Sequence, residues 1–219
     1  MLVIADDEKL EEKMRGLVVE FVLSSIEAKE GPPGMISKLP SFTNTCITIF
    51  LKLLLDITDK SSWNIARETE REDAGQTRNC IFGKRCLCRF SVALGGMTIA
   101  PTAVEQLDAY SVATEWEKRH AALIALVQIA KGSSEVMTEY VEQLVNMVLH
   151  SFQDPHPRVR WAAINAIYKL STNFCPDLQE QYHNQVLPAL AAAMDDFQSP
   201  RVQARAASTL LLFCGPEML

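Results

Sequence analysis

Two short stretches of the sequence decide the fold: PHPRVRWAAINAI at residues 155–167 and SPRVQARAAS at residues 199–208. The motif Pro157-Arg158-Val159 of the first stretch returns as Pro200-Arg201-Val202 in the second, 43 residues later. Proline suits the first turn of a helix, and the small alanines that follow allow helices to approach closely. A repeat of about 40–47 residues with two helices in each unit is typical of HEAT solenoids.

A second pair of similar four-residue motifs extends the repeat toward the N-terminus. Arg119-His120-Ala121-Ala122 precedes Arg160-Trp161-Ala162-Ala163 by 41 residues. An up-and-down helical bundle is the alternative, but a bundle does not require a Pro-Arg-Val repeat. We also expect Asp154 and Arg160 to form a contact that stacks one repeat on the next. The positions that we interpret as structural parts of the repeat are Asp154, Pro157, Arg158, Val159, Arg160, Pro200, Arg201 and Val202.

Hydrophobic spacing is helical along nearly the whole chain. It predicts about nine helices, at residues 8–29, 36–57, 79–94, 99–112, 115–131, 136–153, 157–172, 177–196 and 200–213. We therefore predict an all-α fold, an α-α superhelix of about four and a half HEAT repeats that forms a single segment over residues 1–219. Because the last predicted helix is apolar and not a polar cap, we expect a middle piece of a longer solenoid.

Composition excludes several classes of protein. The chain has 219 residues, a net charge of −6 and a pI of about 5.3, and it lacks a basic block, so nucleic-acid binding through phosphates is not expected. Its longest apolar runs fall well short of the roughly 20 residues that cross a bilayer, so membrane insertion is not expected either. The six cysteines have no regular spacing, and we interpret them as reduced intracellular thiols.

No motif for catalysis or for cofactor binding is present. Cys80, Cys86 and Cys88 lack the second cysteine pair that a zinc site needs, so no metal is predicted. The four histidines do not form a metal-binding pattern, and there is no nucleophile elbow or phosphate-binding loop. Gly95-Gly96 is interpreted as a helix C-cap. We expect a protein that is not an enzyme and has no cofactor.

A polar insertion interrupts the helical pattern at residues 59–79. A loop this long within a compact repeat is usually functional or disordered. Its clustered carboxylates can attract a segment rich in Lys and Arg by an attraction that salt weakens, or they can simply be solvated. The acidic residues that we assign to tentative cargo binding are Glu68, Glu70, Glu72 and Asp73.

Several strings in the second half carry a resemblance to a known family. They are LGGMTIAP at 94–101, EWEKRHAALIALVQIAKG at 115–132, SFQDPHPRVRWAAINAI at 151–167 and QYHNQVLPALAAAMDDFQSPRVQARAA at 181–207. Together they resemble the importin-β (karyopherin-β) superfamily, and within it a middle fragment of the branch called importin five or karyopherin beta three. The first half resembles the branch more weakly, through KLPSF at 38–42, LKLLLDI at 51–57 and EREDAGQT at 70–77.

The resemblance implies a nuclear transport receptor. Such receptors bind protein cargo with basic signal segments on the concave face and release it when the small GTPase Ran, loaded with GTP, binds. They also contact Phe-Gly nucleoporins, and they are found in cytoplasm and nucleus and at the nuclear pore. The resemblance also implies that family members are several times longer than this chain, and we expect the N-terminal repeats that carry most Ran contacts to lie outside the given sequence.

Trp161 and Asn165 lie four residues apart and therefore share a helical face. In related receptors such a pair binds a basic peptide: the indole packs on a Lys or Arg stem and the amide bonds to the extended backbone. The alternative is that Trp161 fills the core between repeats. For the whole chain, the alternatives are a generic HEAT scaffold or regulatory subunit, and a truncated copy without independent transport activity.

Overall fold

The computed structural model describes residues 2–7, 9–28, 40–59, 63–64, 75–132 and 140–214. Over these residues the chain is helical apart from its connections, and the β contact found there is one isolated antiparallel bridge between Ile57 and Gln76. The helices are α1 (Leu2–Asp6), α2 (Glu12–Glu27), α4 (Pro40–Leu54), α5 (Arg78–Leu94), α6 (Gly96–Ser111), α7 (Trp116–Ala130), α9 (Val141–His150), the 3-10 helix η3 (Ser151–Gln153), α10 (Pro157–Asn173), α11 (Asp177–Met194) and α12 (Pro200–Cys214).

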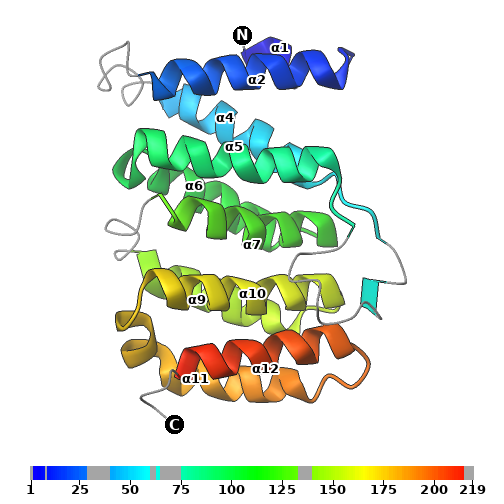
Figure 1. Cartoon of the computed structure of the whole chain (residues 1–219), viewed down its shortest axis with the longest axis vertical. Coiled ribbons are helices and arrows are strands. Elements are labelled where there is room, and N and C mark those ends of the chain that lie inside the picture. Colours follow the sequence, from blue (N-terminus) through cyan, green and yellow to red (C-terminus); the bar gives the residue numbers. More distant parts are fainter. Residues whose placement is uncertain are drawn as a thin grey trace.

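The helices form antiparallel pairs that stack one above another, with the N-terminus and the C-terminus at opposite ends (Figure 1). The second helices of the pairs, α2, α5, α7, α10 and α12, pack in sequence and form one layer, which we call the second-helix layer. Helices α4, α6, α9 and α11 lie behind it. This arrangement is the predicted α-α superhelix of HEAT repeats.

The first predicted helix, 8–29, differs from the structure, which has α1 before α2. The Asp7 carboxylate accepts a hydrogen bond from the backbone N–H of Lys9 (3.0 Å), a local contact that competes with helix continuation. Helix α1 packs against α2 and α4, so α2 does have a partner before it. Elsewhere the described helices follow the predicted ranges closely; residues 29–39 and 133–139, where two more predicted helices begin or end, lie outside the described residues.

Helix α7 is the most deeply enclosed element of the stack. All eleven residues from His120 to Ala130 are buried, because α5, α6 and α10 contact it from different sides. Alanine at 121, 122, 125 and 130 lets these neighbours approach closely. Helix α5 ends as the sequence predicts: Gly95 has a φ of 76° and is the C-cap of α5.

Successive repeats are joined by two equivalent arginine contacts. Arg119 donates from Nε and Nη2 to the two carboxylate oxygens of Asp154 (2.6 and 3.0 Å), and Arg160 donates from the same two nitrogens to one carboxylate oxygen of Asp196 (2.9 and 2.7 Å). The predicted contact between Asp154 and Arg160 is present, but it does not involve the Asp154 carboxylate. Arg160 donates to the backbone carbonyl of Asp154 (2.7 Å), whereas the carboxylate of Asp154 is held by Arg119.

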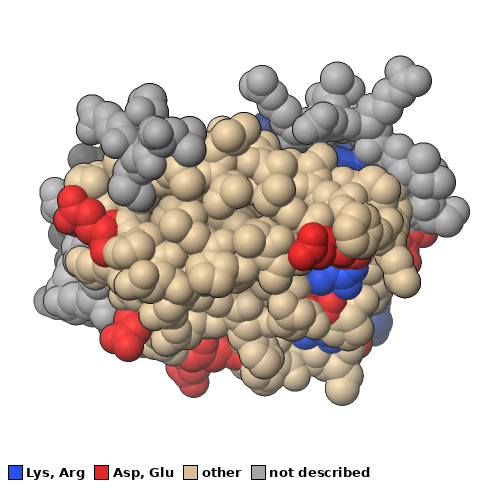
Figure 2. Space-filling view, turned by 90° about the horizontal axis from the view of Figure 1, so that it is seen from below, with Lys and Arg blue, Asp and Glu red and all other residues tan. Residues whose placement is uncertain are grey.

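The two Pro-Arg-Val motifs have the same structural roles. Pro157 and Pro200 begin α10 and α12, and Val159 and Val202 are fully buried beneath them. At the C-terminal end of the stack few charged side chains are visible (Figure 2). Of the last helix pair, Leu211 is among the large apolar side chains left exposed, at 67%.

Candidate protein-binding surface

The predicted pair Trp161 and Asn165 lies on α10, in the second-helix layer. Trp161 is only 4% exposed, and Asn165 is half-buried. The Asn165 side-chain oxygen accepts a hydrogen bond from Nη2 of Arg205 on α12. In this conformation, therefore, both members of the pair are engaged by other parts of the same chain.

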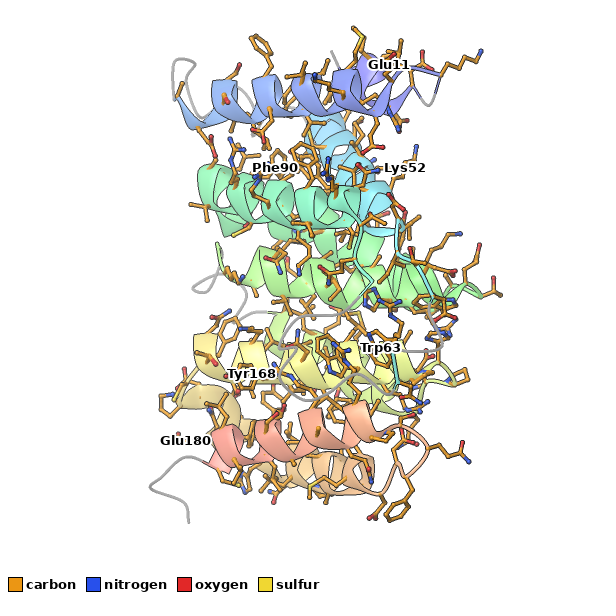
Figure 3. All side chains as sticks on the ribbon, turned by 45° about the vertical axis from the view of Figure 1, so that its right-hand side comes forward. Glu11, Lys52, Trp63, Phe90, Tyr168 and Glu180 are labelled. Atoms are coloured by element: carbon orange, nitrogen blue, oxygen red, sulfur yellow. The ribbon has the colours of Figure 1, made fainter. Side chains whose placement is uncertain are left out.

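Trp161 is covered by Trp63, which comes from the insertion between α4 and α5. The two indoles meet edge-to-face with ring centroids 6.3 Å apart and an interplanar angle of 86°. Trp63 lies over α10 in Figure 3, two helix pairs away from the helices that flank its insertion. It is 4% exposed, so the insertion brings a large apolar side chain onto the second-helix layer instead of leaving it in solvent.

The arginines of the two Pro-Arg-Val motifs both lie close to this indole. The guanidinium carbon of Arg158 lies 5.4 Å from the Trp63 ring centroid, and that of Arg201 lies 4.9 Å from it. Arg158 also stands 5.6 Å from Trp116, and Arg201 stands 5.6 Å from Trp161. These are cation–π distances, and the two arginine residues are only 1% and 5% exposed, and such desolvation strengthens cation–π contacts.

Arginine and aromatic side chains continue to alternate along the second-helix layer. Arg205 lies 5.8 Å from Trp161 and 4.2 Å from Tyr168 on α10. We call the set formed by Trp116, Arg158, Trp63, Arg201, Trp161, Arg205 and Tyr168 the Trp–Arg row. Each arginine in the row lies within cation–π distance of two aromatic rings, so the row ties α7, α10, α12 and the insertion together.

Polar contacts hold the ends of the insertion in place. Nη1 of Arg158 donates to the carbonyl of Thr58 (2.6 Å), and Nη1 of Arg201 donates to the carbonyl of Trp63 (3.4 Å). The Asn64 side chain donates to the carbonyl of Gln198, just before α12 (2.8 Å). Where the insertion starts and ends, the N–H of Thr58 donates to the carbonyl of Gly75 (3.1 Å).

A stacked pair borders the row at the start of α10. The imidazole of His156 lies parallel to Trp116, with ring centroids 3.9 Å apart and an interplanar angle of 5°. Its Nδ1 accepts a hydrogen bond from the Arg158 backbone N–H (3.3 Å), which caps α10. Burial lowers the pKa of His156, although the carboxylate of Asp59, 3.7 Å from its Nε2, acts in the opposite direction.

Positive charge surrounds the far end of the row. The ammonium group of Lys169 lies 5.2 Å from the Tyr168 ring. Its pKa is lowered mainly by burial, and also by the charges of Lys131, Arg205 and Lys84.

The predicted carboxylates, Glu68, Glu70, Glu72 and Asp73, lie outside the described residues, so their attraction for a basic segment stays a prediction.

The cysteines do not come together into a chemical site within the described part of the chain. Cys46, Cys80 and Cys86 are buried, and burial raises the pKa of Cys46 and Cys86 to about 12. The described residues contain no cluster of three or more His, Cys, Asp or Glu that could hold a metal ion. None of the described helices is long and apolar enough to cross a bilayer.

Sequence reasoning missed the residue that organises this surface. Trp63 falls within the polar insertion, and the repeat pattern gives no signal for Arg205 or Tyr168. The available signal was a lone tryptophan within a stretch of charged and polar residues, DKSSWNIARETERE. Such a large aromatic side chain is rarely left in solvent, so a buried anchor was the simpler expectation.

Comparisons with known proteins agree with this architecture. The model of the importin repeat family matches residues 7–101. Importin subunit beta-3 of Saccharomyces cerevisiae is 28% identical over 188 residues, which make up 84% of this chain and 17% of that protein. A second family model, the Vacuolar 14 Fab1-binding region, matches residues 117–211, the part in which the 41- to 43-residue repeat is clearest.

Solved structures of the karyopherin Kap121p match nearly the whole chain. The form bound to the extreme C-terminus of the protein phosphatase Cdc14p has a TM-score of 0.85 at 25% identity, over 97% of this chain and 21% of Kap121p. The form bound to RanGTP has a TM-score of 0.86 at 26% identity, with the same coverage of both chains. The chain thus spans about a fifth of the length of these relatives.

The fold, the repeat and these matches together show a HEAT-repeat segment that is similar to members of the importin-β family. Within that family, it is similar in sequence to importin subunit beta-3 and in structure to Kap121p.

Proposed function

We propose that this chain supplies a peptide-binding surface of a nuclear import receptor, on the second-helix layer around Trp161 and Asn165. One observation carries the proposal: this layer already holds a short segment of the insertion, Trp63-Asn64, in a 3-10 conformation. The segment is held by the contact of Trp63 with Trp161 and by two hydrogen bonds: the Trp63 carbonyl accepts one from Arg201, and the Asn64 side-chain amide donates one to the carbonyl of Gln198. A surface that binds one such segment has the chemistry to bind another.

The comparisons support the partner class. Structures of Kap121p are described as bound to Pho4p, to Ste12p, to Nup53p and to RanGTP. For this chain we propose protein cargo with basic signal segments, drawn in by Glu68, Glu70, Glu72 and Asp73. Ran and Phe-Gly nucleoporins are further proposed partners, with cytoplasm and nucleus as the proposed location. These assignments are extended from proteins about five times as long.

The test is a binding measurement with a labelled Lys/Arg-rich peptide and a matched peptide in which glutamine replaces the basic residues. We expect the basic peptide to bind, and to bind at least tenfold more weakly at 0.3 M salt than at 0.05 M, because screening weakens exposed charge pairs. The variant E68Q/E70Q/E72Q/D73N should lose most of that affinity. Equal binding of the two peptides, or an unchanged affinity of the variant, would overturn the proposal.

A second candidate is a HEAT scaffold or regulatory subunit outside transport, and the match of residues 117–211 to the Vacuolar 14 model favours it. A pull-down with Ran loaded with GTP and with the basic peptide separates the two. Failure of both, together with capture of a different partner by a direct binding assay, would favour the scaffold. A chain that binds none of these would be a copy without independent transport activity.

A further inference from the structure

We propose that the groove between the N-terminal halves of α2 and α5 is a docking site for an acidic segment of a partner protein, one with an apolar side chain among its carboxylates. The groove has a volume of about 790 Å³ and lies between two helices that contact each other. Helix α7 separates it from α10, the helix of Trp161 (Figure 1). The inference goes beyond the proposed function, because both the site and the charge of the partner are different.

Ion pairs hold α2 and α5 together on the C-terminal side of the groove. Arg89 of α5 donates two hydrogen bonds of 2.7 Å to Glu27 of α2, and it also pairs with Glu20. Arg85 reaches the same Glu20 at 3.2 Å. Among the described residues no ion pair joins the earlier turns of the two helices, and this is where the groove opens.

The rim of the groove is cationic. Three cations line it: Lys13, Arg78 and Arg85. Glu12 is the one carboxylate among the described lining residues. Lys13 and Arg78 are exposed and form no ion pair within the described part of the chain. Because the whole chain has a net charge of −6, these cations oppose its overall charge, and arginine clusters of this kind recognise acidic motifs.

The interior of the groove is apolar. Ile81 is 53% exposed, and Phe82 and Gly16 also line the groove. A Cβ at Gly16 would meet only Cε1 of Phe82, at 4.0 Å, so the space above this glycine is open. The guanidinium carbon of Arg85 lies 5.4 Å from the centroid of the Phe82 ring, which puts a cation beside the apolar surface. An exposed apolar surface with a polar rim is typical of a protein interaction site.

The charges and the apolar interior together select the chemistry of the partner. Carboxylates match Lys13, Arg78 and Arg85, and an apolar side chain over Gly16 and Ile81 removes apolar surface from water. A small polyphosphate would match the cations but leave the apolar surface uncovered. A Lys/Arg-rich segment would be repelled by the rim. An acidic segment with an apolar residue satisfies both parts of the groove.

The test is a binding measurement with the full chain and a labelled peptide, Gly-Glu-Glu-Leu-Phe-Glu-Glu-Gly. One matched peptide has glutamine in place of every glutamate, and another has serine in place of leucine and phenylalanine. We expect each matched peptide to bind roughly tenfold more weakly or worse, because the rim and the interior both contribute. Equal binding of the three peptides, or binding of inositol hexakisphosphate without binding of the acidic peptide, would overturn the proposal.

Arg78→Glu assigns the binding to this groove. Since Arg78 is exposed and makes no ion pair within the described residues, R78E should fold normally and bind the acidic peptide roughly tenfold more weakly or worse. Lys131→Glu is the matched control, because it makes the same change of charge at an exposed residue that follows α7 and does not line the groove. An equal loss of affinity in both variants would overturn the proposal, since net charge would then explain the binding.

Gly16→Leu tests the interior without changing any charge. The new side chain should occupy the groove and weaken binding, and circular dichroism checks that the variant is folded. A folded G16L that binds as tightly as the wild type would contradict the site. If the acidic peptide binds as expected while the Lys/Arg-rich peptide does not, the proposed function fails and the acidic-segment site stands. The reverse result removes only the acidic-segment site.

Discussion

Arg160 of α10 and Asp196 of the turn before α12 form an ion pair across one repeat step, through two hydrogen bonds of 2.9 and 2.7 Å to the same carboxylate oxygen. The same guanidinium donates to the carbonyls of Asp154 and Pro155 behind it (2.7 and 3.2 Å). Arg119 makes the corresponding contacts one repeat earlier. It donates to the carboxylate of Asp154 in the next repeat, and to the carbonyls of Ala113 and Thr114, which precede α7. Each arginine thus binds the loop that precedes its own helix and also the corresponding loop of the next repeat.

Replacing Arg160 should weaken the whole stack. Arg160→Ala removes the ion pair and leaves a mostly buried carboxylate without its partner, so we expect a loss of about 2–4 kcal/mol in the free energy of unfolding. Arg160→Lys should recover only part of that loss, because lysine cannot reproduce the planar fork. Urea denaturation followed by circular dichroism measures both.

Gln203 provides the matched control. It occupies the position of Arg160 in the following repeat, but donates a single hydrogen bond, to the carbonyl of Met194 (2.7 Å). Gln203→Ala should cost no more than about 1 kcal/mol. If R160A and Q203A were equally mild, the arginine contacts would not be what holds the repeats together.

Two glycines in helices should respond oppositely to alanine. At Gly83 in α5 a Cβ would lie 2.9 Å from Cβ of Leu53 and 3.1 Å from the carbonyl of Phe50, both in α4. Gly83→Ala should therefore destabilise the protein by about 1–3 kcal/mol through overpacking. Gly16→Ala in α2, whose new Cβ would meet only Cε1 of Phe82 at 4.0 Å, should stabilise it by about 0.4–1 kcal/mol.

Thermal denaturation of the two single variants is the measurement for this pair. A stabilising G83A would mean that α4 and α5 can move apart at little cost, contrary to the close approach seen here.

Stability should fall in mildly acidic solution because of His156. Burial holds its pKa in the folded chain below the ordinary value of 6.5, so folding favours the neutral imidazole. The contribution is fully present above the pKa of the unfolded chain, and it is lost as pH drops through 6.5 toward the lower folded value. The neutral ring is also the form whose Nδ1 can accept the Arg158 backbone N–H.

The variant His156→Asn tests this origin, since asparagine also caps a helix but does not titrate in this range. Denaturation midpoints measured from pH 7.5 to pH 5 should decline less steeply in H156N than in the wild type. Parallel declines would assign the acid sensitivity to other groups.

Thiol reactivity should report the burial of the cysteines. Cys175 is exposed, Cys88 and Cys214 are partly exposed, and the other three are buried. Since the thiolate is the reactive form, the raised pKa of Cys46 and Cys86 adds to their protection. A dithionitrobenzoate time course at pH 8 should show one fast thiol, removed by Cys175→Ser, and three that react only after unfolding. Rapid modification of all six would contradict the packing of α4 and α5.

Much of the fold could be predicted because its cause is local and repeated. The 3.6-residue spacing of apolar side chains, prolines at the first turn of α10 and α12, and the recurrence of Pro-Arg-Val set the helices and their pairing. The misplaced boundary at the N-terminus arose from a local hydrogen bond at Asp7, which interrupts a pattern that otherwise reads as one helix.

The candidate site could be predicted only in part. Sequence spacing correctly put Trp161 and Asn165 on one helical face, since helix geometry alone determines that. It could not reveal that Arg205 reaches Asn165 or that Arg160 pairs with Asp196 instead of the Asp154 carboxylate, because those partners are chosen across repeats.

By itself, then, the sequence determined a helical repeat, its period and the residues that mark each unit, because those depend on side chains three, four or about forty positions apart. Only the tertiary structure decided the role of Trp63. An insertion has no period of its own, so the surface it covers depends on where stacked repeats place Arg158 and Arg201. These arginines, 43 residues apart in the chain, are brought within cation–π distance of one indole by the packing of α10 against α12.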